Sequence, residues 1–218
     1  VSSAQLSRPF LIASGHITPK VQVHARSYQF DGGLPTNAFY AGHQGQTSAS
    51  MAIPTFSLDG GMAFERPYRL FERSWVQTLE PRAFYVKTAY RNQSDLPNFD
   101  TGPNDYNFAS IYSENTFSGQ DRVSDSHTLT LGVLTRFIHP DSGAEGARLG
   151  LAQRFRLSDQ IVQLTPQTAP LRSGNSDILA GASVFVTPRL SLDTLVDYSD
   201  QDQRLERSSV GARYNPSG

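Results

Sequence analysis

The stretch from Trp75 to Ile138 decides the fold, because two alternating segments flank one long polar segment. The first segment reads WVQTLEPRAFYVKTAY (75–90) and the second reads VSDSHTLTLGVLTRFI (123–138). Between them, residues 92–122 are rich in Asn, Asp, Ser, Gly and Pro. Loops of this length are uncommon in compact soluble domains. They are ordinary at one end of an outer-membrane β-barrel, where long loops alternate with short turns.

The same alternation recurs along the chain and predicts antiparallel strands. Residues 52–65 form the clearest segment, with apolar side chains at nearly all even positions and Thr55, Ser57 and Asp59 among the odd ones. This segment is longer than the ~5–6 residues of a typical soluble strand and suffices for the ~9–11 residues of a tilted transmembrane strand. Residues 1–10 are polar and show no pattern. The predicted strands are 20–30, 52–65, 74–91, 128–138, 146–157, 177–187, 190–199 and 203–214.

The connections between these strands alternate between long and short up to the last one, 200–203, which is short where a long one is expected. The predicted long loops include 31–50, and the predicted short turns include 66–73. The fold class that follows is all-β: an antiparallel transmembrane β-barrel wall of about eight strands taken from a larger barrel. No domain boundary is visible, so residues 1–218 are expected to form one partial outer-membrane β-barrel domain. Because such a piece has two unpaired edges, it is not expected to be a stable soluble monomer.

The arginines predict which face of each strand meets water. Arg148, Arg154 and Arg156 share one phase of their strand, opposite Leu149 and Leu151. An Arg or Lys on the lipid face costs ~2–4 kcal/mol at the membrane midplane. The water-filled lumen is therefore the expected location of the charged phase in each strand, including Glu80, Arg82, Arg136 and Arg154. Residues 177–187 are apolar in both phases, which leaves their facing open.

Two local features are expected to shape the polar face. Pro81 lies between Glu80 and Arg82 and predicts a β-bulge, with an internal ion pair between the two charges or a belt that contacts a plug or polar cargo. In the long loop, Gly119, Asp121 and Arg122 are expected to fold the chain back onto the wall, with Arg122 pairing a lumen carboxylate. Five aromatic residues are candidates for interfacial girdles or for core and loop positions: Trp75, Tyr85, Tyr90, Tyr112 and Tyr198.

Composition narrows the class of function. Hydrophobic residues make up 38% and charged residues 18% of the 218 residues, which suits a wall with one apolar and one neutral polar face. The net charge of −1 and the lack of a basic block predict no nucleic-acid partner. There is no cysteine, which excludes a disulfide framework or a thiolate metal site. There is also no window of 18 consecutive apolar residues, which predicts no transmembrane helix. The absence of a signal peptide at Val1 suggests that the sequence is a fragment of an exported protein.

Catalytic and metal-binding patterns are weak. The histidines show no metal-ligand spacing, and neither a nucleophile elbow nor a phosphate-binding glycine loop is present. Asp121, Asp125 and His127 could be imagined as a surface-hydrolase site, but solvated loop residues are the preferred interpretation. The sequence therefore predicts no enzyme activity, no cofactor and no metal site.

Several pieces of the chain, in their order and spacing, resemble the barrel of the LptD family of lipopolysaccharide-assembly (organic-solvent-tolerance) outer-membrane proteins. These pieces are 78–82, 90–95, 117–122 and 130–137, and the resemblance covers most of residues 50–215. It implies a C-terminal fragment of a barrel in the outer membrane of a Gram-negative bacterium, without the N-terminal periplasmic domain and the closing strands. It also implies a translocon that inserts lipopolysaccharide into the outer leaflet. The implied partners are an LptE-like lipoprotein plug, lipopolysaccharide, periplasmic bridge proteins acting through the missing domain, and outer-membrane lipid.

Two other classes stay open at this point. One is a different outer-membrane class, either a small closed eight-stranded barrel of porin-like type or a surface hydrolase. The other is a soluble β-sandwich binding module, which the negative mean hydropathy favours.

Overall fold

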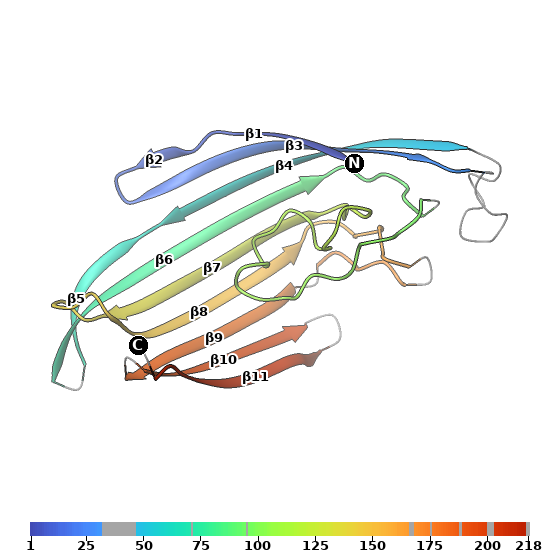
Figure 1. Ribbon diagram of the computed structural model, residues 1–218. Helices are drawn as coiled ribbons and strands as arrows, with labels where there is room; N and C mark the ends of the chain where they lie inside the picture. Colours follow the sequence, from blue (N-terminus) through green and yellow to red (C-terminus); the bar gives the residue numbers. More distant parts are fainter. Residues whose placement is uncertain are drawn as a thin grey trace.

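The computed structural model describes residues 1–31, 47–70, 72–94, 96–165, 168–174, 176–187, 189–199 and 203–216, so the predicted loop 31–50 lies largely outside the described residues. These residues form one antiparallel sheet (Figure 1). The all-β antiparallel prediction is confirmed. No helix among the described residues is long and apolar enough to cross a membrane. The strands are β1 (Ser2–Ser7), β2 (Phe10–Ile12), β3 (Gly15–Gln29), β4 (Ser48–Met62), β5 (Phe64–Leu70), β6 (Arg73–Thr88), β7 (His127–Ile138), β8 (Glu145–Arg156), β9 (Ser176–Thr187), β10 (Leu190–Ser199) and β11 (Arg204–Tyr214).

The sheet is an open meander. Its order is β1-β3-β4-β6-β7-β8-β9-β10-β11, with β2 pairing β3 and β5 pairing β6. The short turns β2–β3, β5–β6, β7–β8 and β9–β10 lie at one end of the sheet and the long connections 89–126 and 157–175 at the other (Figure 1); we call these the short-turn end and the long-loop end. The short connection from β10 to β11 lies at the long-loop end, since Ser199 pairs with both Asp177 and Arg204. A single open sheet matches neither a closed eight-stranded barrel nor a two-sheet sandwich.

The structure has more strand than the sequence pattern indicated. The patternless first residues form β1 and β2 at the edge, since backbone pairing to β3 needs no apolar alternation. The predicted turn 66–73 is wrong in extent, because β5 continues to Leu70 and pairs with β6 as far as Arg73. Both phases of β5 contain a charged residue, so the segment lacks the apolar alternation that marks β4.

The predicted bulge at Pro81 is also wrong. Pro81 pairs with Val133 of β7 without a register shift. On the other side of β6, the pairing with β4 ends at Gly61 opposite Arg82, and the pairing with β5 begins at Phe64 opposite Leu79. The two pairings have the same register. Proline has no N–H to donate, so the strand loses ladder hydrogen bonds there while its side chains keep their phase.

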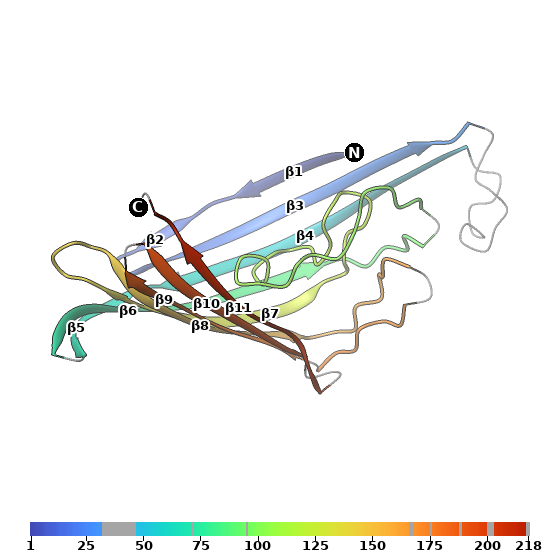
Figure 2. The same cartoon turned by 60° about the horizontal axis from the view of Figure 1, so that its bottom comes forward.

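The two faces of the sheet differ sharply. In β4, Ile53, Thr55 and Ser57 are buried, whereas Phe56 and Leu58 are 39% and 37% exposed. The buried side is partly covered by the long loop 89–126, which lies in the trough formed by the curved sheet (Figure 2). We call this side the loop face and the opposite side the outer face. The facing of β9, which the sequence left open, follows from burial: Leu179 is fully buried on the loop face, and Val184 is exposed on the outer face.

Aromatic side chains mark two levels on the outer face. Tyr68 packs on Phe137, and Trp75 packs on His139, near the short-turn end. Tyr85 packs on His127 near the long-loop end. Between these levels, the described outer-face positions of β4 and β6–β10 carry no charged side chain. Tyr112, which the sequence offered as a girdle residue, instead lies in the loop against Phe84 on the loop face.

Candidate functional site

The loop face is built around a cluster where the long loop packs on β8 and β9. Ile111 from the loop, Ala152 and Leu179 are almost completely buried, and Phe108 and Tyr112 pack against them. Burial of these apolar side chains stabilises the docked loop. The connection 89–126, although polar in sequence, is therefore an internal layer of the structure.

Glycines make room for these loop aromatics. A Cβ on Gly150 or Gly181 would lie 2.8 Å from ring atoms of Phe108, and a Cβ on Gly132 would meet the Tyr112 hydroxyl. The three glycines occupy loop-face positions of the adjacent strands β7, β8 and β9. Glycine within a strand often marks the close approach of another group, and this signal could have revealed the docking site from the sequence.

Arg154 fastens the loop to β8. Its side chain is only 5% exposed and donates to the backbone carbonyl oxygens of Ser110, at 3.1 Å, and Ile111. The guanidinium also lies 5.3 Å from the centre of the Tyr106 ring. The arginine predicted to face a lumen thus lies on the loop face and caps the carbonyls of the docked segment.

Asp121 and Arg122 hold the part of the loop that lies before and around Phe99. The Asp121 carboxylate accepts hydrogen bonds from the Phe99 and Asp100 amides, at 2.6 and 3.0 Å, and from the Tyr28 hydroxyl of β3 at 2.9 Å. Arg122, 4% exposed, donates to the carbonyl oxygens of Gln93 and Leu96. Both residues connect the loop to itself and, through Tyr28, to the sheet. The carboxylate partner expected for Arg122 stays a prediction.

Gly119 permits the turn that brings Asp121 into place. Its φ is +75°, and a Cβ there would lie 2.3 Å from the carbonyl oxygen of Asp100. The Asp100 carboxylate accepts the Gln120 amide at 3.0 Å, and this hydrogen bond lowers the pKa of Asp100. The turn therefore depends on glycine at position 119, which adopts a left-handed backbone conformation and has no Cβ.

Replacement of Gly119 by alanine should destabilise the protein by about 2–3 kcal/mol, since the strained φ and the clash with a backbone atom add together. Gly143→Ala is the matched control: its φ is +69°, but nothing lies within 4 Å of the added Cβ, so only about 1 kcal/mol is expected. Thermal unfolding in detergent, followed by circular dichroism, measures both. Equal losses for the two variants would contradict the close approach at Asp100.

The residues imagined as a hydrolase site have separate partners. Asp125 accepts the backbone amides of Ile161 and Val162, at 3.0 and 2.9 Å, and so ties the connection 157–175 to the long loop. His127 packs edge-on against Tyr85 on the outer face, with ring centres 5.8 Å apart. Asp121, Asp125 and His127 therefore take part in three different contacts. Among the described residues, no group of three or more His, Asp or Glu side chains is placed to hold a metal ion.

A polar belt crosses the loop face nearer the short-turn end. Arg82 donates to both oxygens of Asp59, at 2.8 and 3.1 Å, and Glu80 pairs with Arg136 at 2.9 Å. The predicted ion pair between Glu80 and Arg82 is therefore replaced by two cross-strand pairs. In both pairs the partners are diagonal neighbours on adjacent strands, which lie within reach of long side chains.

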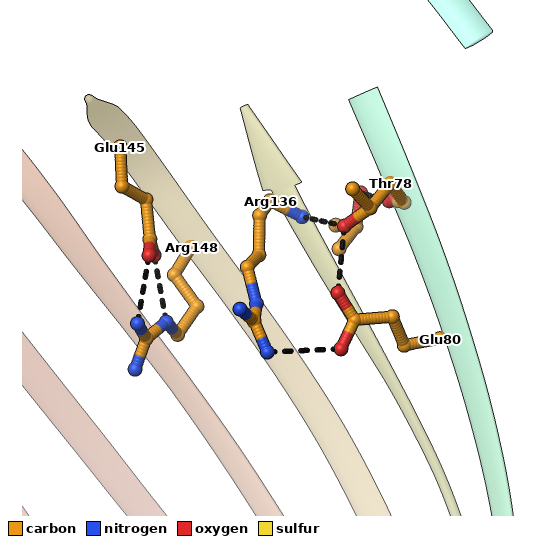
Figure 3. Close-up of polar contacts among 6 residues, drawn as sticks. Thr78, Glu80, Arg136, Glu145 and Arg148 are labelled. Atoms are coloured by element: carbon orange, nitrogen blue, oxygen red, sulfur yellow. Dashed lines mark hydrogen bonds and ion pairs between the residues drawn. The ribbon is translucent and has the colours of Figure 1, made fainter. Parts of the chain in front are cut away.

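Figure 3 shows how this belt continues onto β8. Arg148 lies directly opposite Arg136 in the β7–β8 register and donates twice to Glu145, at 2.7 Å each. A register shift next to Gly146 brings Glu145 onto the same face as Arg148. Like charges directly opposite each other are unfavourable, so each arginine is neutralised by its own carboxylate.

A cavity of about 1070 Å³ lies between the docked loop and the short-turn end. It is lined by side chains from β3 across to β11, with Phe108 and Tyr112 on the loop side. Glu80, Arg82, Arg136 and Arg148 face it together with Asp193. The sequence predicted a polar face, but not that the loop would fill one half of the trough and leave the other half open.

The fold and this face define a class: an open, curved antiparallel sheet with an outer face that carries no charge between its two aromatic levels on β4 and β6–β10, and a charged loop face partly filled by its own loop. The chain belongs to the LptD family, described as "LPS transport system D", whose family model matches residues 1–218.

Three relatives illustrate the similarity, and each is named LPS-assembly protein LptD. The chain is 53% identical over 213 residues to the protein of Polaromonas sp., covering 98% of this chain and 25% of that protein. It is 52% identical over 213 residues, with the same coverage, to the protein of Acidovorax sp.. The protein of Burkholderia thailandensis is 43% identical over 201 residues, covering 91% of this chain and 24% of its own length. The chain thus spans about a quarter of the length of the curated relatives it matches.

Proposed function

We propose that this chain forms part of the wall of a transmembrane β-barrel in the Gram-negative outer membrane, within a translocon that inserts lipopolysaccharide into the outer leaflet. The single observation that carries the proposal is the segregation of charge between the two faces. Leu149 and Leu151 are 45% and 51% exposed on the outer face, while Arg148 and Arg154 alternate with them on the loop face.

The spacing of the aromatic levels supports a membrane setting. From Trp75 to Tyr85, at ~3.3 Å per residue, the strand extends roughly 33 Å, and a tilt of about 40° reduces this to roughly 25 Å. That is the height of the apolar band of outer-membrane barrels. Lys87, the next outer-face residue of β6 beyond Tyr85, would lie outside this band.

The names of the relatives supply the cargo. Lipopolysaccharide is a lipid with a polar saccharide, and the loop face offers a charged, water-accessible cavity beside an apolar outer face. In this proposal the saccharide meets the polar belt, the acyl chains meet the outer face, and no covalent step occurs. The described edge strands β1 and β11 would pair with further strands of the full-length wall.

The same proposal assigns the partners. An LptE-like lipoprotein would occupy the trough near the cavity, where the long loop does not cover the sheet. Periplasmic bridge proteins would deliver lipopolysaccharide through a domain outside this chain. Outer-membrane lipid would cover the outer face.

Labelling with a bilayer-confined probe tests the proposal. We expect a lipid with a photoreactive group on its acyl chain, reconstituted with the full-length protein, to modify the outer-face side chains Phe56, Leu58, Phe64, Leu149 and Leu151. Leu179 is the matched control, because it is a leucine on the next strand that is fully buried on the loop face; Arg154 should also stay unmodified. Equal modification of Leu179 and Leu151, or none at Leu151, would refute the membrane wall.

A further inference from the structure

Arg66 is a charged side chain on the outer face, at the aromatic level near the short-turn end. The register places it with the outer face, opposite Gln77 and between Phe64 and Tyr68. Its guanidinium lies 5.4 Å from the centre of the Tyr68 ring. Among the described residues, no carboxylate forms an ion pair with it. An arginine facing lipid without a counter-ion is costly.

A chain of hydrogen bonds fixes the orientation of this guanidinium. Arg66 Nε donates to Gln77 Oε1 at 2.9 Å, Gln77 Nε2 donates to Thr135 Oγ1 at 3.1 Å, and Thr135 Oγ1 donates to the carbonyl oxygen of Thr78 at 2.7 Å. The network runs across β5, β6 and β7. Of the five N–H donors of a guanidinium, the one on Nε is used within the described part of the chain, and the two terminal nitrogens are directed to an acceptor on the exposed side.

We propose that Arg66, held by Gln77 and Tyr68, binds the phosphate of a membrane phospholipid at the short-turn rim of the outer face. Two terminal guanidinium nitrogens match two phosphate oxygens in a bidentate arrangement. The aromatic residues Tyr68 and Trp75 lie at the same level, where amphipathic rings meet lipid headgroups. The inference rests on the proposed function, because it requires this face to lie in a membrane.

Photocrosslinking in nanodiscs tests the site in the full-length protein. The probe is a phosphatidic acid with a photoreactive group next to its phosphate, and the matching diacylglycerol, which lacks the phosphate, is the lipid control. We expect Arg66→Gln to lower phosphatidic acid crosslinking to the peptide 64–79 about tenfold, as expected for loss of a charge-assisted contact. Arg69→Gln is the matched variant, because Arg69 lies in the same strand but in the opposite phase, opposite Ser74, and it should crosslink like the unmodified protein.

Each remaining outcome has a defined meaning. Equal crosslinking of the unmodified protein and Arg66→Gln would overturn the site, as would diacylglycerol crosslinking that depends on Arg66. Competition by inorganic phosphate in the buffer would show a site for free phosphate and overturn the lipid assignment. The acyl-chain probe separates the two proposals: modification of Leu151 with Arg66-independent crosslinking refutes only the phosphate site, whereas no modification of Leu151 refutes both.

Discussion

Replacement of Arg154 by methionine should make the segment 105–113 exchange its backbone amide hydrogens about 100-fold faster. The side chain donates two hydrogen bonds from a charged group to the carbonyls of Ser110 and Ile111 in a buried site. Each such bond contributes about 1.5–3 kcal/mol, and about 3 kcal/mol corresponds to a 100-fold change in the open population. Methionine fills similar space but leaves both carbonyl oxygens without their donor.

Arg148→Met is the matched control for this experiment. Arg148 lies on the same strand and face, but its hydrogen bonds go to Glu145 and not to the loop. Hydrogen–deuterium exchange with mass spectrometry of the full-length protein should therefore show unchanged protection of 105–113 in this variant. Equal acceleration in both variants would mean that the charge of the face, and not the Arg154 clamp, holds the loop.

Replacement of Asp121 by alanine should increase chymotrypsin cleavage after Phe99 about 100-fold. The Phe99 side chain is already 79% exposed, but its amide and that of Asp100 are bound by the Asp121 carboxylate. A protease needs the backbone to leave this arrangement, so its rate follows the open population. Loss of two hydrogen bonds to a charged acceptor, about 3 kcal/mol in total, gives the expected change.

Asp105→Ala controls for the loss of a negative charge from the same loop. The Asp105 side chain is 86% exposed, and its ion pair with Arg207 is long, at 3.8 Å. Its removal should leave cleavage after Phe99 unchanged, with cleavage after Tyr90, whose side chain is 47% exposed, as the internal reference. If Asp105→Ala accelerates cleavage as much as Asp121→Ala, the carboxylate clamp is not what protects this backbone.

Arg154→Met and Asp121→Ala both test whether the long loop is a fixed part of the trough. Its aromatics sit over glycines of β7–β9, and its backbone is bound by Arg154 and Asp121. The cavity of about 1070 Å³ lies where the loop ends, towards the short-turn end. In the proposed barrel, this arrangement confines passing or plugging molecules to the half of the trough that carries the Glu80–Arg136 and Asp59–Arg82 pairs.

Alternation was the reliable part of the sequence signal. Phe56, Leu58, Leu149 and Leu151 lie on the outer face as their phase indicates, because a strand turns successive side chains to opposite faces. Alternation missed β1, where edge pairing leaves both faces exposed. It also missed most of β5. At Pro81 the predicted bulge is wrong, because an interrupted ladder accommodates the missing N–H without a register shift.

The amino-acid sequence by itself determined the antiparallel sheet, the phase of most strands and the separation of long loops from short turns, because these depend on local periodicity. Only the tertiary structure decided the partners of the charged residues, since an ion pair such as Glu80–Arg136 joins residues far apart in the chain through the strand register. The same holds for the docked loop. Whether a polar connection lies in solvent or fills a trough depends on the glycines and the arginine that face it from other strands, and their positions relative to the loop exist only after the sheet has formed.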